Sequence, residues 1–81
     1  ADAAARLAGQ ARQLYQVWIS FNKEHPLLFI AHFNCSTLLQ QIGDEQGGEA
    51  ELKAALALKP DFAPACINLG SSYERRGMAQ Q

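Results

Sequence analysis

The sequence has no excess of charge of either sign, no long apolar run and little cysteine. Seven Lys and Arg residues face eight Asp and Glu residues, so the concentrated basic face that binds nucleic acids or anionic membranes is missing. No stretch approaches the ~20 continuous apolar residues of a membrane span. Residues 1–6 also lack the layout of a secretory signal. We therefore expect a cytoplasmic protein that binds neither nucleic acid nor membranes.

The two cysteines, Cys35 and Cys66, are too few for a disulfide framework. Both fall in helical contexts where a small core residue would serve, so we expect buried free thiols in a reducing compartment. A chain of 81 residues forms one small domain at most. Its 48% of apolar residues is enough for a core, but we expect its stability to be marginal or shared with neighbouring segments.

A 34-residue repeat is the most informative feature that the sequence does contain. Similar residues recur at this spacing in seven pairs, which are Pro26 and Pro60, Leu28 and Phe62, Ala31 and Ala65, Asn34 and Asn68, Thr37 and Ser71, Leu39 and Tyr73, and Gly43 and Gly77. Several of these residues are Gly, Pro or Asn, which have special backbone or hydrogen-bonding roles, so coincidence is a poor explanation. The period is that of a helix–turn–helix repeat.

Apolar spacing and helix breakers predict helices in the repeat region. These helices are expected over residues 29–41, 49–58 and 64–77. Gly43 should take the left-handed conformation that closes the first of them, and Asp44 should cap the second. Pro60 ends the second helix because proline cannot continue it. The residues expected on the buried face of the second helix are Leu52, Ala55, Leu56 and Leu58.

The first 24 residues differ in character and predict one helix of about five turns. Its apolar seam, at spacings of four, three, four and three, consists of Leu7, Ala11, Leu14, Trp18 and Phe21. When the 34-residue frame is extended backwards, Leu14, Trp18 and Phe21 fall where a second repeat helix keeps its core residues. The helix is therefore either a repeat helix or a cap.

The repeat residues resemble the tetratricopeptide repeat (TPR) family. The resemblance rests on Gly43-Asp44, on the run from Ala55 to Pro60, and on Asn68-Leu69-Gly70 followed by Tyr73 and Gly77. It covers about 50 of the 81 residues, and Gly48 departs from it because an alanine is usual where the two helices cross. The family implies an all-α, right-handed solenoid of helix–turn–helix units whose concave face binds proteins.

A narrower resemblance links the runs 25–34 and 58–65 to the N-terminal repeats of bacterial SPINDLY-like proteins. These are relatives of the O-linked N-acetylglucosamine transferases, in which a TPR superhelix precedes a glycosyltransferase domain that uses a nucleotide sugar. The sequence contains no such domain, so the resemblance implies no catalytic residue here.

Asn34 and Asn68 are the main candidates for binding a partner. They share one repeat position, and the side chain of asparagine both donates and accepts hydrogen bonds, so it can hold a peptide backbone. The transferase resemblance implies such an asparagine ladder, and the alternative is that both side chains bond only to neighbouring backbone. The full set of predicted partner-binding residues is Asn34, Asn68, Thr37, Gln41, Ser71 and Arg75. The presumed concave face also carries Phe33, Gln40, Ile67 and Glu74.

His32 and Cys35, with His25 and Cys66 as additions, are the candidates for chemistry. A metal site would need at least three convergent ligands, and Cys–His catalysis would need an orienting group and a pocket, which the sequence does not reveal. We interpret these residues as filling a repeat interface. We expect no metal, no cofactor and no catalytic residue.

We interpret residues 1–25 as an N-terminal helix, 26–62 as a complete TPR and 63–81 as the first helix of a following one, about four helices in all. Since repeats bury their apolar faces against neighbours, we expect Leu69 and Tyr73 to be bare within one chain. Either the chain then self-associates, or the native protein continues past residue 81. The predicted function is a scaffold that binds a peptide or partner protein as part of a glycosyltransferase-type protein. The alternative is a freestanding TPR adaptor with no attached enzyme.

Overall fold

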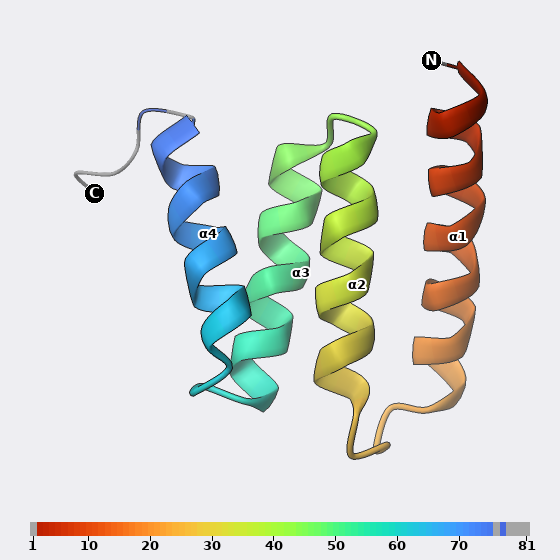
Figure 1. Cartoon of the computed structure of the whole chain (residues 1–81). Coiled ribbons are helices and arrows are strands. Elements are labelled where there is room, and N and C mark those ends of the chain that lie inside the picture. The colour runs from red at the N-terminus through yellow and green to blue at the C-terminus, as the bar shows by residue number, and fades with distance from the viewer. Residues whose placement is uncertain (1, 76, 78–81) are drawn as a thin grey trace.

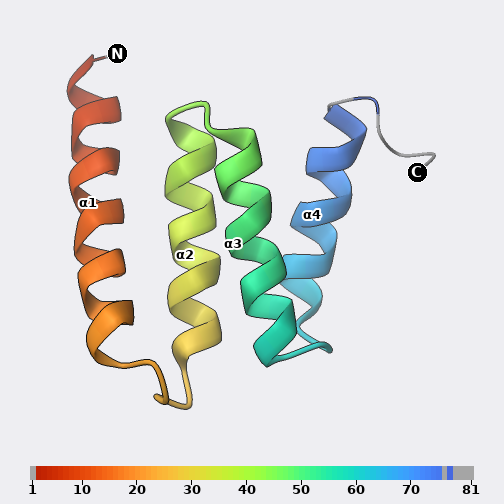
Figure 2. The same cartoon turned by 180° about the vertical axis from the view of Figure 1, so that it is seen from behind.

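The computed structural model describes residues 2–75 and residue 77. The described residues form four α-helices and no strand, namely α1 (Asp2–Phe21), α2 (Leu28–Gln41), α3 (Glu45–Leu58) and α4 (Ala63–Arg75). Consecutive helices run in opposite directions and lie side by side, with α1 and α4 at the two edges (Figures 1 and 2). The molecule measures 37 × 34 × 15 Å, so it is a thin layer. The prediction of an all-α chain of about four helices is confirmed.

The turn between α2 and α3 forms as its sequence predicts. Gly43 has a φ of +88°, which other residues rarely adopt, and it ends α2. The Asp44 carboxylate accepts a hydrogen bond from the Gly47 backbone N–H at 2.9 Å. With this cap α3 begins at Glu45, four residues before the predicted start at 49. The cap thus holds two glycines, Gly47 and Gly48, inside the helix.

The 34-residue spacing of the sequence recurs in the backbone hydrogen bonds. The equivalent pairs are Leu28 N–H to His25 O at 3.0 Å with Phe62 N–H to Lys59 O at 3.1 Å, and Gly43 N–H to Gln40 O at 3.1 Å with Gly77 N–H to Glu74 O at 3.0 Å. Gly77, like Gly43, has a positive φ. The turns that start and end α2 and α4 are therefore built alike, and these two helices are equivalent in the chain.

The core lies among α2, α3 and α4. Its fully buried centre is formed by Leu52, Ala55 and Ala65, against which Phe29, Phe33, Leu56, Phe62 and Leu69 pack. The Phe62 ring meets those of Phe29 and Phe33 edge to face at 5.0 and 5.2 Å. Phe33, which the sequence places on the presumed concave face, is partly buried and packs against the core cluster. Leu58, predicted to be buried, is exposed at the end of α3.

The apolar seam predicted for α1 is largely uncovered. Leu14 is 71% exposed and Phe21 is 83% exposed, so the prediction that they occupy core positions is wrong. The residues that lie against the rest of the chain are one position further along the sequence. Of these, Ala8 is buried and Arg12, Tyr15 and Ile19 are partly buried in α1, and Asn22 just after α1 is also partly buried. The physical reason is that, among the described helices, α2 makes the main contact with α1, and one neighbour covers only one stripe.

The burial pattern also corrects the repeat spacing for α1. At an offset of 37 from this stripe, the buried or partly buried residues are Glu45, Glu49, Leu52 and Leu56 of α3 and Lys59 just after it. The linker 22–27 before α2 has six residues and the linker 59–62 before α4 has four, which accounts for most of the change from 34. The change from 34 to 37 is three residues, which is almost one helical turn, so the two offsets place the α1 seam on roughly the same side of the helix.

The C-terminal helix differs from its prediction in three side chains. Leu69 packs against the core and Tyr73 is half-buried with the Lys53 ammonium 5.8 Å from its ring centre, so neither is bare. Ile67 is the large apolar residue of α4 that is exposed. Cys35 is buried as predicted, but Cys66 is exposed, and the prediction for it is wrong. Predictions for residues 76 and 78–81 lie outside the described residues.

Within the part of the chain that the structure describes, none of the helices has the combination of length and apolar character that crossing a bilayer requires.

Candidate functional site

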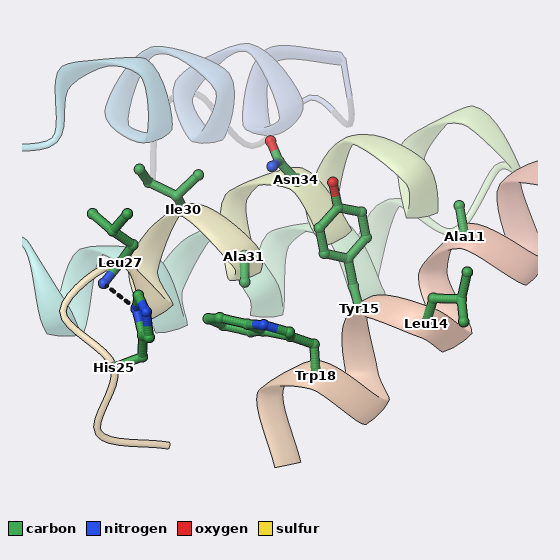
Figure 3. A pocket seen from close by; sticks show the side chains of 9 residues that line it. All are labelled: Ala11, Leu14, Tyr15, Trp18, His25, Leu27, Ile30, Ala31 and Asn34. Atoms are coloured by element: carbon green, nitrogen blue, oxygen red, sulfur yellow. Dashed lines mark hydrogen bonds between the residues drawn. The ribbon is translucent and has the colours of Figure 1, made fainter. Parts of the chain in front are cut away.

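An apolar groove of about 490 Å³ between α1 and α2 is the main candidate site. Nine residues line it, namely Ala11, Leu14, Tyr15, Trp18, His25, Leu27, Ile30, Ala31 and Asn34. Tyr15 and Trp18 project from α1 toward α2, while Ile30 and Asn34 come from the facing side of α2 (Figure 3). The volume is within the range of ligand-binding pockets, and the lining is mostly apolar with a few polar groups, as such pockets require.

The linker between α1 and α2 shapes one end of the groove. The His25 ring packs edge to face on Trp18 at 5.1 Å, and its Nδ1 accepts a hydrogen bond from the Leu27 backbone N–H at 3.0 Å (Figure 3). A neutral imidazole whose Nδ1 accepts carries its proton on Nε2, which can then donate. The Asn22 side chain donates to the Trp18 carbonyl at 2.7 Å and so satisfies one acceptor at the end of α1. Trp18 is therefore held at both its ring and its backbone.

Three polar groups converge on this groove, from Tyr15, His25 and Asn34. Each can both donate and accept a hydrogen bond in its neutral form, and none carries a fixed charge. The groove therefore suits an apolar ligand surface that bears a few backbone or amide groups.

The six predicted partner-binding residues do not form one site. Asn34 lines the α1/α2 groove, and Ser71 lines a second, shallower groove on α4. Thr37 and Gln41 are exposed on α2, and Asn68 is partly buried on α4. The Arg75 guanidinium donates to the Glu45 carboxylate at 3.1 Å, which ties it to α3.

The second groove, of about 420 Å³, follows one face of α4. It is lined by Cys66, Ile67, Gly70, Ser71, Tyr73 and Glu74. A side chain placed at Gly70 would meet no atom within 4 Å, so the middle of this face is open.

A polar cluster joins α1, α2 and α3 around Cys35. The His32 Nδ1 lies 2.6 Å from the Glu51 carboxylate, so Glu51 is the orienting group that sequence reasoning did not find. Burial, reinforced by the Glu51 charge against the weaker opposing effect of Arg12, raises the pKa of the Cys35 thiol to about 11. A buried thiol that stays protonated at neutral pH is not an activated nucleophile. The cluster therefore links helices rather than supplying Cys–His catalysis.

A second polar cluster holds α4 against α3. The buried Ser72 hydroxyl lies 2.8 Å from a Glu45 carboxylate oxygen and 2.7 Å from one of Glu49. One hydroxyl has one proton, so it donates to one carboxylate at a time. The pairing spans 23 to 27 residues of chain, a separation that a search for local motifs would not detect.

The described residues contain no group of three or more His, Cys, Asp and Glu that could hold a metal ion. Comparisons with protein-family models, with curated proteins and with solved structures found no match to the chain. The groove between α1 and α2 is therefore interpreted from its own geometry.

Proposed function

We propose that this chain is a protein-interaction module of the TPR type, a right-handed solenoid segment that binds an amphipathic helix of a partner protein in the groove between α1 and α2. The observation that carries the proposal is the uncovered apolar lining of that groove. Leu14 and Leu27 are both more than half exposed, and both line the groove. Exposed apolar residues that gather around a groove indicate a binding surface, whereas single exposed apolar residues do not.

The kind of ligand follows from the repeat. The face of α3 that is equivalent to the groove side of α1 is covered by a helix, α2. A groove of the same construction between α1 and α2 therefore suits another helix, docked by apolar residues at helical spacing. Asn34 and Tyr15 would bond polar groups along the edge of that helix.

The test uses Trp18, the only tryptophan of the chain, as a reporter inside the groove. A peptide of residues 27–42, with serine in place of Cys35, is titrated into the chain while Trp18 emission is followed. We expect a saturable blue shift because the helix shields the indole from water. In Leu14→Glu the affinity should fall roughly tenfold or more, because a carboxylate in an apolar contact is desolvated.

Leu58→Glu is the matched control, since Leu58 is also an exposed leucine but does not line the groove. It should bind the peptide as the unaltered chain does. Asn34→Ala should weaken binding by several-fold if this residue bonds the ligand. No change in Trp18 emission and no heat of binding would overturn the proposal.

The parent protein is proposed to be of glycosyltransferase type, with this segment presenting partners to an attached enzyme. The second candidate is a freestanding adaptor with no attached enzyme. The polar clusters around Cys35 and Ser72 link helices, so the two grooves are left as binding surfaces, and an adaptor needs no more than these. The free thiols fit the reducing cytoplasm. On either proposal the 81-residue chain should neither hydrolyse nor transfer a nucleotide sugar, and clear turnover would contradict both.

A further inference from the structure

The contact between α2 and α3 shows how this chain closes a helix pair. A side chain at Gly48 of α3 would lie 3.2 Å from the Ser36 carbonyl of α2, so the two backbones approach closely there. One turn along, His32 pairs with Glu51. Phe33 then packs against the buried cluster that contains Leu52 and Ala55, as described above. Three contacts therefore define the α2–α3 pair. They are the close approach at Gly48, the His32–Glu51 pair and the packing of Phe33.

The α3 side of this contact has an uncovered counterpart on α1. At the offset of 37, which aligns the two buried stripes, Gly48, Glu51, Leu52 and Ala55 correspond to Ala11, Leu14, Tyr15 and Trp18. These four residues are the α1 lining of the groove. The α1 side of the groove is thus equivalent to the surface of α3 that packs against α2. On α1, no helix of the described chain covers this surface.

The α2 side of the contact has an uncovered counterpart on α4. At the offset of 34 that relates these two helices, His32, Phe33, Ser36 and Gln40 correspond to Cys66, Ile67, Gly70 and Glu74. These four residues line the second groove, on α4. The chain therefore carries both halves of its own helix-pair contact, one on each edge.

We infer that the helix that fills the α1/α2 groove is α4 of a second copy of this chain. The inference rests on the proposed function and names its partner. Docking in the register of the α2–α3 pair sets Gly70 of one chain against Ala11 of the next. It also sets Ile67 against Tyr15 and Trp18.

The side chains at this junction suit each other. Gly70 and Ala11 are both small, which permits the close approach that Ser36 and Gly48 make within the chain. The polar pair of His32 and Glu51 is replaced by Cys66 and Leu14, two apolar side chains that are both exposed in the single chain. Burying such side chains favours association because it removes apolar surface from water.

The two docking surfaces are different, so the contact is heterologous. Each bound copy still has one free groove and one free α4, and further copies add to the same line until a ring closes or the concentration limits growth. The particles should therefore grow with concentration instead of stopping at a dimer.

Sedimentation velocity tests this with two blocked variants, Leu14→Glu in the groove and Ile67→Glu on α4. Both side chains are more than half exposed, so neither change removes a core contact, and circular dichroism checks that the helices remain. We expect the unaltered chain to grow in mass with concentration and each variant alone to be a monomer. An equimolar mixture of the two variants should form a dimer and nothing larger, because one groove and one α4 remain compatible.

Leu58→Glu should associate as the unaltered chain does. A chain that stays monomeric, association of either variant alone, or a mixture that does not pair would each overturn the inference. If the chain is monomeric but the peptide of residues 27–42 still binds Ile67→Glu, the proposed function stands and only the second copy is excluded as the partner. If the peptide also fails, both fall.

A cross-link tests the register independently. In Leu14→Cys, mild oxidation should join the introduced thiol to the exposed Cys66 of the next chain and give a ladder of covalent multimers. In Leu58→Cys the ladder should form roughly tenfold more slowly, because that thiol is not held opposite Cys66. Equal rates in the two variants would exclude this register.

Discussion

The α2–α3 contact and the outer face of α1 are built from similar apolar material but have opposite solvent exposure. In the first, Leu52 and Ala55 are completely buried beneath the aromatic residues of α2. In the second, Leu14 and Phe21 project mostly into solvent. At the offset of 37, Leu14 corresponds to Glu51, which contacts His32 of the covering helix α2, whereas Phe21 corresponds to Leu58, which is exposed on α3 as well. The difference at Leu14 therefore arises from the presence of a covering helix.

This difference separates two questions that a hydrophobic pattern merges. The spacing of apolar residues on α1 indicates that the face requires a partner, but it does not indicate which chain supplies it. A single layer 15 Å thick cannot cover the outer faces of its own edge helices. Edge helices with apolar seams are therefore where such a chain meets other proteins.

Leucine truncation on the two faces gives the largest expected effect. Leu52→Ala removes a fully buried side chain and should lower the free energy of unfolding by about 2–5 kcal/mol, which is enough to unfold a domain of this size in large part. Leu14→Ala should change it by no more than about 0.5 kcal/mol. Urea unfolding followed by circular dichroism measures both.

The measurement belongs in the Ile67→Glu background so that association does not contribute to the stability of α1. Comparable losses for the two leucines would contradict the comparison, because the α1 seam would then be packed within the single chain.

A pH series provides a second test of how tightly the inner contact is closed. Cys35 has a pKa of about 11 in the folded chain against 9.0 when unperturbed, with burial as the main cause. Below pH 9 the thiol is protonated in both states and favours neither. Between pH 9 and 11 the unfolded chain loses this proton first, so stability falls as pH rises.

By pH 10.5 the loss due to this thiol should reach about 2 kcal/mol relative to pH 8. Cys35→Ala is the control, because it removes this thiol and leaves the other ionisable groups of the chain unchanged. The two stability curves should diverge above pH 9, and parallel curves would show that the thiol is solvated. In the Ile67→Glu background, which does not associate, a thiol reagent at pH 8 should modify Cys66 rapidly and Cys35 only on unfolding.

Much of the fold could be predicted from the sequence because its signals are local. Gly43 and Asp44 fix the α2–α3 turn through backbone conformation and a cap, and both act as predicted. The start of α3 was missed because its first residues include two glycines, whose poor helix propensity is overridden by the cap at Asp44. The linker before α2 is longer than the linker before α4, so the 34-residue spacing does not align α1 with α3, and the core positions predicted for α1 are wrong.

The candidate site was predicted less well, because its members are distant in sequence. Asn34 was identified from its repeat position, but Tyr15, Trp18 and His25 join it only once α1 lies against α2. The signal in the sequence that could have indicated the groove is the apolar seam of α1. Apolar spacing alone predicts a core position for this seam, because it does not distinguish a buried face from an uncovered one. Glu51 was missed as the partner of His32 because the two residues are 19 positions apart on different helices.

Glycine substitution is the finest test of the comparison, with an expected effect of about 1 kcal/mol. Replacing a mid-helix glycine by alanine stabilises a helix by roughly 0.8–1.0 kcal/mol when the new methyl group meets nothing. Gly70 satisfies this condition in the single chain, so Gly70→Ala should raise the free energy of unfolding by that amount in the Ile67→Glu background. At Gly48 the new methyl group would lie 2.9 Å from the Gln40 Cγ and 3.2 Å from the Ser36 carbonyl. The side chain of Gln40 can move but the backbone carbonyl cannot easily do so, and Gly48→Ala should therefore show none of the gain. Equal stabilisation at the two positions would mean that the inner helix pair is no closer than the open face of α4.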